Sequence, residues 1–158
     1  ISSSHFILFI SFIAFSQEHC NYLVTLNSEN LKDTGKFKLF IKSTDDKSFR
    51  IRKEVNFCNM RLNEFELYDE KTKSFDKIHL GTKDIDCFTY NDKYKKLKPN
   101  ETYTYNVDIK SDFEVLRNSK FFETYNDRKY RFKISFNLDS YDRCGESNTL
   151  ITDWIYKN

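Results

Sequence analysis

Histidine is the side chain that most often activates a serine, cysteine or threonine nucleophile near neutral pH, so its positions show where catalysis could occur. His5 lies in an apolar N-terminal segment, and His19 immediately precedes Cys20. His79 follows a strand-like run and precedes Gly81, where a surface turn is the expected setting. No Gly-x-Ser-x-Gly, P-loop or His-Glu-x-x-His motif is present. The sequence therefore predicts no catalytic residue and a protein that is not an enzyme.

Acid-rich stretches are the next candidates for chemistry, because carboxylate oxygens bind calcium. Three such stretches are Ser43–Ser48, Lys83–Asp86 and Asn137–Asp142. None follows the D-x-[DN]-x-[DN]-G pattern of a calcium loop, and turns are acid-rich for local hydrogen-bonding reasons. The cysteines form no C-x-x-C pair and His79 stands apart from them, which argues against zinc. We expect no metal and no cofactor.

The even number of cysteines predicts two disulfides in an oxidising compartment. Four thiols allow three pairings, and the sequence leaves all three open. The favoured pairing joins Cys58 to Cys87 around a central hairpin and Cys20 to Cys144 near the two ends of the chain. A bridge from Cys20 to Cys58 would contradict it.

The N-terminal segment resembles a bacterial export signal that has lost its first residues. Phe6–Phe15 is apolar and uncharged, and Ser16-Gln17 follows it. Such a run is shorter than the roughly 20 residues that span a bilayer but suits the apolar region of a signal peptide. We therefore expect a signal at residues 1–16 and one mature domain at 17–158, secreted or in the periplasm or cell envelope, with no stable membrane span after cleavage. The alternative is a buried first strand.

The charge of the chain points to no particular partner. The 26 basic and 24 acidic residues leave a net charge of +2, and acids stand beside nearly every basic stretch. A solvated surface is the expected consequence, and no nucleic acid partner is predicted.

Short runs with alternating apolar and polar residues dominate the chain and predict β-strands. The clearest covers 129–138, where Tyr130, Phe132, Ile134, Phe136 and Leu138 share one face. Residues 81–96 read as irregular, and 110–125 as either one short helix or a crossing loop. Seven or eight short strands in 158 residues predict a single all-β domain, an antiparallel β-sandwich. The expected strands lie within 21–26, 35–43, 49–57, 63–70, 74–80, 102–109, 129–138 and 149–157.

The stretch Leu97–Ile109 combines a Pro-Asn turn with strict alternation. Pro99 fixes its own φ for the first turn position, and Asn100 tolerates the left-handed conformation that follows. The pattern resembles the Leu-x-Pro-Gly-Glu-Thr entry into a strand that ends hydrophobic-Asp-hydrophobic in immunoglobulin-like domains of secreted bacterial proteins. These domains include those beside metallopeptidases and the BsuPI-type proteinase inhibitors. The matching residues are Leu97, Pro99, Glu101, Thr102, Val107, Asp108 and Ile109, followed by the Tyr-containing strand RKYRFKISF.

The resemblance covers Leu97 to Leu138, about a quarter of the chain, and implies an immunoglobulin-like fold. Two positions depart from the pattern: Asn100 replaces the usual Gly, and Arg128-Lys129 stands where a Gly normally precedes the Tyr. Because one fold supports many functions, the resemblance implies an inhibitor function only as an alternative.

Aromatic residues are the compositional excess of the chain, at 17%. Most occupy alternating strand positions and are expected in the core. The others have polar neighbours and are candidates for a binding surface, where tyrosine and tryptophan are enriched. The alternative for each is a ring packed beneath a loop. These candidate binding residues are Tyr90, Tyr94, Tyr125, Tyr141 and Trp154.

These observations predict an exported, non-catalytic binding or interaction module whose partner is a protein or a polysaccharide. One alternative is a proteinase inhibitor that inserts a loop within Lys83–Lys95 into a protease. Another is a carbohydrate-binding module that uses the spare aromatic rings. A structural subunit of an envelope assembly is a further alternative, which an exposed hydrophobic edge strand would favour.

Overall fold

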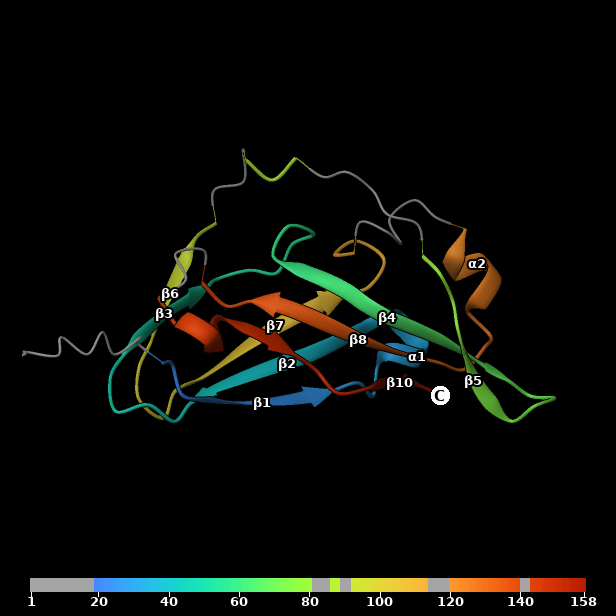
Figure 1. Cartoon of the computed structure of the whole chain (residues 1–158), viewed down its shortest axis with the longest axis horizontal. Helices are drawn as coiled ribbons and strands as arrows, with labels where there is room; N and C mark the ends of the chain where they lie inside the picture. The colour runs from blue at the N-terminus through green and yellow to red at the C-terminus, as the bar shows by residue number, and fades with distance from the viewer. Residues whose placement is uncertain (1–18, 81–85, 89–91, 114–119, 140–142) are drawn as a thin grey trace, which may run out of the picture.

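The computed structural model of the chain describes residues 19–80, 86–88, 92–113, 120–139 and 143–158 (Figure 1). The predicted signal at 1–16 therefore lies outside the described residues. Short helices occur at α1 (Leu31–Thr34) and α2 (Phe121–Tyr125), with a 3₁₀ turn at Gly145–Asn148. The strands are β1 (Tyr22–Asn27), β2 (Lys36–Ser43), β3 (Phe49–Arg52), β4 (Met60–Asp69), β5 (Ser74–Lys77), β6 (Tyr94–Leu97), β7 (Thr102–Asp108), β8 (Tyr130–Asn137), β9 (Thr149–Ile151) and β10 (Ile155–Lys157).

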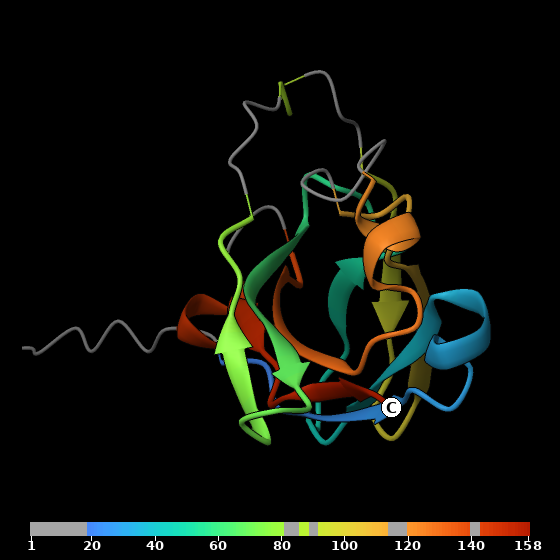
Figure 2. The same ribbon diagram turned by 90° about the vertical axis from the view of Figure 1, so that its right-hand side faces the viewer.

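The strands form two facing antiparallel sheets and a small ribbon (Figures 1 and 2). One sheet has the order β1-β2-β7, and the other has the order β10-β8-β4-β5 with β9 also paired to β8. Strands β3 and β6 form the ribbon. The prediction of an all-β antiparallel sandwich is confirmed, although the described residues form ten strands and not the seven or eight expected.

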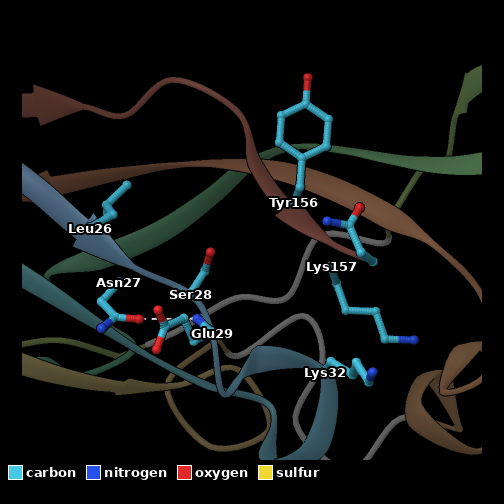
Figure 3. Close-up of a pocket in the computed structure, with 8 residues that line it drawn as sticks. Leu26, Asn27, Ser28, Glu29, Lys32, Tyr156 and Lys157 are labelled. Carbon is cyan, nitrogen blue, oxygen red and sulfur yellow. Dashed lines mark hydrogen bonds between the residues drawn. The ribbon is translucent and has the colours of Figure 1, made fainter.

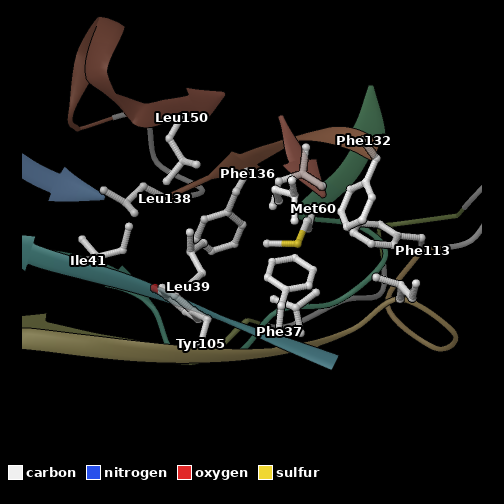
Figure 4. Close-up of a cluster of buried hydrophobic side chains, with 14 of the residues drawn as sticks. Phe37, Leu39, Ile41, Met60, Tyr105, Phe113, Phe132, Phe136, Leu138 and Leu150 are labelled. Carbon is white, nitrogen blue, oxygen red and sulfur yellow. The ribbon is translucent and has the colours of Figure 1, made fainter. Parts of the chain in front are cut away.

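The two sheets enclose one apolar core (Figure 4). The Phe37 ring of β2 lies 5.8 Å from the Phe132 ring of β8, and the Tyr105 ring of β7 lies 4.9 Å from that of Phe136. All four side chains are buried. Complete burial of such a side chain contributes roughly 1.5–3 kcal/mol, so these contacts between the sheets are a main source of stability.

Strand β8 shows the predicted alternation from end to end. Tyr130, Phe132, Ile134, Phe136 and the following Leu138 are all buried. This strand pairs with β4 on one side and with β9 and β10 on the other, so it is an interior strand of the larger sheet. Its outward side chains therefore lie in the middle of the larger sheet.

Strand β4 is longer than predicted. A β-bulge interrupts its alternation, and the prediction of where the strand begins relied on that alternation. The strand begins at Met60, whereas alternation alone indicated a start near Asn63. The pairing with β8 shifts register between Leu62 and Glu64. The extra residue allows both Met60 and Phe65 to face the core although an odd number of positions separates them.

The predicted Pro-Asn turn before β7 is confirmed. The Glu101 amide donates to the Lys98 carbonyl oxygen at 3.0 Å, and Asn100 has a φ of 64°. Pro99 thus holds the first corner of the turn and Asn100 the left-handed second corner. The Asn100 amide also donates to the Ser43 carbonyl oxygen at 3.1 Å, which fixes the turn to the end of β2.

Three local expectations differ from the structure. Residues 81–96 were expected to be irregular, but Tyr94–Leu97 form β6 because β3 supplies a partner strand. Within 110–125, helix α2 covers Phe121–Tyr125, and 114–119 lie outside the described residues. The C-terminal run is two strands, β9 and β10, instead of one.

The structure contains the favoured disulfide pairing. Cys20 is bonded to Cys144, and Cys58 to Cys87, with Cα–Cα distances of 4.9 Å and 5.8 Å. The first bridge is buried, whereas Cys58 and Cys87 are partly exposed. Within the described ranges, no helix is long and apolar enough to cross a membrane.

Candidate functional site

The five predicted binding aromatics do not form one site. Tyr90 and Tyr141 lie outside the described residues. Tyr94 is in β6, beneath the Arg50 guanidinium, whose carbon is 4.7 Å from the ring centre. Tyr125 ends α2, at the opposite end of the molecule from β6 in Figure 1. Trp154 lies between β9 and β10, where it contacts Arg131 and Lys133.

Trp154 belongs to a group on the outer face of the larger sheet, which we call the aromatic–arginine cluster: Phe75, Arg131, Trp154 and Tyr156. The Arg131 guanidinium carbon lies 4.3 Å from the Phe75 ring centre, 4.2 Å from that of Trp154 and 5.9 Å from that of Tyr156. The Phe75 and Tyr156 rings meet edge to face at 6.0 Å. A single cation from β8 therefore contacts three rings, one from β5 and two from the C-terminal segment.

Strand register brings two members of this cluster, Arg131 and Tyr156, side by side. Arg131 of β8 lies directly opposite Glu66 of β4 and Tyr156 of β10, and Glu66 lies opposite Lys77 of β5. The four side chains form one row across four strands. Because neighbouring strands are about 4.8 Å apart, residues distant in sequence come into contact along such a row.

Hydrogen bonds fix the guanidinium at the centre of the cluster. Arg131 Nε donates to Glu66 Oε1 at 2.7 Å, and a terminal nitrogen of the same guanidinium lies 2.5 Å from that oxygen. Its other terminal nitrogen donates to the Tyr156 hydroxyl at 3.3 Å. A planar guanidinium held in this way loses little further side-chain entropy on binding a partner.

The cluster extends along the sheet on both sides. The Tyr68 ring packs edge to face on Phe75 at 5.2 Å, and the Lys129 ammonium is 5.7 Å from the Tyr68 ring centre. The Lys133 ammonium lies 4.7 Å from the Trp154 ring centre. Tyr156 is 43% exposed, so the surface is accessible to a large partner.

Sequence reasoning found Trp154 but missed the other members of the cluster. Phe75 and Tyr156 were in runs expected to be strands, and rings in strands were expected in the core. The alternation in β8 placed Arg131 on the outer face, which was the available signal. It did not reveal which residues of β4, β5 and β10 would lie opposite.

A second exposed feature is Phe88, whose side chain is 101% exposed. It follows Cys87, which the disulfide to Cys58 ties to the segment before β4. The Phe88 amide donates to Asp86 Oδ1 at 3.1 Å. A large apolar side chain is thus presented to solvent beside a covalent anchor.

A hollow of about 520 Å³ lies where the ends of β1 and β10 approach one another (Figure 3). Lys157 contributes to its wall, but the ammonium group donates to the carbonyl oxygens of Asn126 and, at 2.7 Å, Arg128. Burial lowers the pKa of Lys157. Because these carbonyls already hold the ammonium, we assign Lys157 a structural role. The lining residues are Leu26, Asn27, Ser28, Glu29, Lys32, Tyr156, Lys157 and Asn158.

The edge strand β1 exposes apolar side chains. Leu23 is 59% exposed, and Val24 and Leu26 are each 36% exposed. In the part of the chain that the structure describes, β1 pairs only with β2, so its other edge is open.

The described residues contain no group of three or more His, Cys, Asp or Glu side chains that could hold a metal ion. Comparison with known proteins finds no matching family model, no matching curated protein and no matching solved structure. The resemblance to immunoglobulin-like domains of secreted bacterial proteins therefore stays a prediction.

Proposed function

We propose that the protein is an exported, non-catalytic interaction module that binds a protein partner through the aromatic–arginine cluster. The observation that carries this proposal is the Arg131 guanidinium held among Phe75, Trp154 and Tyr156 on an accessible sheet face. Tryptophan, tyrosine and arginine are the residues most enriched in the energetic centres of protein interfaces. Two disulfides are typical of an oxidising compartment and support export.

The arrangement of the rings favours a protein over a polysaccharide at this face. A sugar stacks on an open aromatic face, but Arg131 lies over the Phe75 and Trp154 rings, and Lys133 also contacts Trp154. The Phe75 and Tyr156 rings stand at 69° to one another and do not form a flat platform. Such a surface offers ring edges and a fixed cation, which suit the mixed apolar and polar surface of a folded protein.

Affinity capture from the envelope and culture fluid of the source organism tests the proposal, with the chain as bait. Trp154→Ala with Tyr156→Ala removes two rings of the cluster. Phe88→Ala is the matched control, because it removes an exposed ring elsewhere. We expect a partner that the unchanged chain and the Phe88 variant both retain and that the double variant loses. Equal retention by all three baits would contradict a role for the cluster.

A second candidate function, proteinase inhibition, is favoured by the exposure of Phe88 beside the Cys58–Cys87 bridge. Proteases that cleave after large aromatic residues would accept such a side chain. Titration of secreted proteases of that specificity against the chain tests this candidate. Inhibition should disappear in Phe88→Ala and persist in the Trp154→Ala, Tyr156→Ala variant. Undiminished protease activity at excess protein would exclude it.

A further inference from the structure

The outer face of the smaller sheet carries a row of lysines along β2, the strand between β1 and β7 (Figure 1). Lys36, Lys38 and Lys42 are all exposed on this face, and the half-buried Phe40 lies between the last two. Since an antiparallel strand rises about 3.4 Å per residue, the row extends over about 20 Å. We call Lys36, Lys38 and Lys42 the β2 lysine row.

The cross-strand neighbours of Lys38 and Lys42 are uncharged. Lys38 lies opposite Asn27 on one side and Asn106 on the other, and Lys42 lies between Leu23 and Thr102. No ion pair within 4 Å is recorded for the three lysines among the described residues. The opposite sheet differs, because there Arg131 faces Glu66 and Lys133 faces Glu64 across the strands.

One acid does lie opposite the row, but its side chain is engaged elsewhere. Asp108 is the cross-strand neighbour of Lys36. Its Oδ1 accepts a hydrogen bond from the Lys110 amide at 3.0 Å, within the loop that follows β7. This bond holds the carboxylate in the turn, and no ion pair within 4 Å joins Asp108 to Lys36.

Lys36 and Lys38 border a hollow of about 380 Å³. Its lining contains two cations, amides and a hydroxyl but no acid. The carboxamide oxygen of Asn27 accepts from the Glu29 amide at 3.1 Å, as the dashed line in Figure 3 shows. That bond leaves the Asn27 NH₂ group as the free donor of this side chain. The lining residues are Asn27, Asn30, Thr34, Lys36, Phe37, Lys38 and Asn106.

We propose that this face binds an extended acidic polysaccharide, with its anionic groups on Lys36 and Lys38 and its hydroxyls on Asn27 and Asn106. Strands alternate, so β7 adds the exposed Thr102 and Thr104 beside the same row. Amides and hydroxyls both donate and accept, which matches the hydroxyls of a sugar better than the apolar stems of an acidic peptide. This goes beyond the protein-binding function proposed above, because it uses the opposite face of the sandwich.

Affinity electrophoresis of the full chain tests the proposal with four probes: polygalacturonate, dextran sulfate, neutral dextran and poly-glutamate. We expect retardation by at least one acidic polysaccharide, weakening with added salt, and none by dextran. The comparison of polygalacturonate with dextran sulfate separates carboxylate from sulfate recognition. Failure to bind either acidic polysaccharide would overturn the proposal, and so would equal retardation by poly-glutamate.

Paired variants separate a site from general charge attraction. Lys36→Gln with Lys38→Gln should weaken binding by at least about tenfold, since two charge-assisted hydrogen bonds are lost. Lys47→Gln with Lys71→Gln changes the net charge equally at two exposed turn positions and should leave binding nearly unchanged. An equal loss in both pairs would show attraction without a site and overturn the proposal.

Asn27, an uncharged residue that lines the hollow, supplies a second test. Asn27→Asp keeps an oxygen for the Glu29 amide but replaces the free NH₂ donor with a negative charge. Its unfolding midpoint should remain close to that of the unchanged chain, while polysaccharide binding falls. Unaltered binding would place the ligand elsewhere. The Trp154→Ala, Tyr156→Ala variant should bind the polysaccharide normally, so this test and that of the proposed function can fail separately.

Discussion

At the scale of single residues, one buried hydroxyl group, that of Tyr105, connects the core to the ribbon. The Tyr105 hydroxyl donates to the Arg52 carbonyl oxygen at 2.5 Å. The buried Arg52 side chain is in turn ion-paired with Asp92, which also accepts from the Asn56 side chain at 2.9 Å. Ring burial and hydrogen bonding thus act together at the edge between the sandwich and β3.

Removal of this hydroxyl should weaken the connection. Tyr105→Phe keeps the ring but leaves a buried carbonyl without its donor, and we expect a loss of about 1–2 kcal/mol in the free energy of unfolding. Urea denaturation measures it. Tyr156→Phe, at an exposed tyrosine, should change stability by less than about 0.5 kcal/mol. Equal losses in the two variants would contradict the assigned role.

Two buried tyrosines predict how stability depends on alkaline pH. Burial raises the pKa of Tyr105, and it raises the pKa of Tyr130 to about 12, from an ordinary value of 10.0. The unfolded chain therefore releases these protons at lower pH than the folded chain. Linkage makes this stabilising contribution complete below pH 10.0 and progressively lost as the pH rises above it.

Unfolding free energies measured by urea between pH 9 and pH 12, roughly the range in which tyrosines titrate, check this dependence. We expect a decline above pH 10.0. Tyr105→Phe should decline less steeply. A stability that rose with pH in this range would contradict the direction of both shifts.

At the scale of elements, the bulge in β4 lets the apolar side chains of both halves of the strand face the same core. Met60 and Phe65 are both buried because the bulge inserts one extra residue between them and so shifts the register with β8. The Asn63 side chain accepts from the Ser135 hydroxyl at 2.9 Å, which fixes the bulge against β8.

Deletion of Asn63 should be tolerated, because it removes the extra residue of the bulge. Met60 and Phe65 would then be an even number of positions apart, and regular alternation keeps both side chains on the core face. We expect a loss of no more than about 1 kcal/mol in the free energy of unfolding, from the hydrogen bond to Ser135. Deletion of Glu66 is the comparison: it makes the buried Phe65 and Leu67 consecutive, so one of them would point to water, and we expect a loss of at least about 3 kcal/mol. Urea denaturation compares the two variants, and equal losses would contradict this account of the bulge.

The open edge of β1 carries its own prediction. Natural edge strands are commonly protected by lysine or proline, but Tyr22–Asn27 contains no charged residue. Leu23→Lys adds a charge at the most exposed apolar residue of the strand and should reduce association at high protein concentration. Light scattering during heating measures it. Lys substitution of Ile151, another exposed side chain, is the comparison, and equal effects would argue against a special role for the β1 edge.

At the scale of the whole molecule, the two disulfides close loops of different length. Cys20 and Cys144 are 124 positions apart, whereas Cys58 and Cys87 are 29 apart. In the chain-entropy account, closure of the longer loop restricts the unfolded chain more strongly. The longer bridge also ties β1 to the segment before β9.

Replacement of each pair by alanine tests this account. Loss of Cys20–Cys144 should cost about 5 kcal/mol, and loss of Cys58–Cys87 about 3.5 kcal/mol. Mild reductant should open the partly exposed Cys58–Cys87 bridge first, because thiolate must reach the sulfur. Mass spectrometry after alkylation identifies the order. Earlier reduction of the buried Cys20–Cys144 bridge would contradict the prediction.

The sequence by itself determined most of the local structure. Period-two alternation indicated which side chains of β2, β7 and β8 face the core, and Pro99 with Asn100 specified the turn before β7. These features could be predicted because they depend on local properties of the chain: the backbone preferences of each residue, and the tendency of apolar side chains to be buried and of polar side chains to remain in water. β6 was missed because its strand depends on pairing with β3.

Only the tertiary structure decided which outward side chains meet. Alternation shows that Arg131 and Lys38 face away from the core, but it does not show that Arg131 meets Glu66, Phe75 and Tyr156 while Lys38 meets two asparagines. The register between strands that are far apart in sequence determines which of these side chains become neighbours. One outer face thus became a charge-paired aromatic surface and the other kept its positive charge, a difference that no local pattern contains.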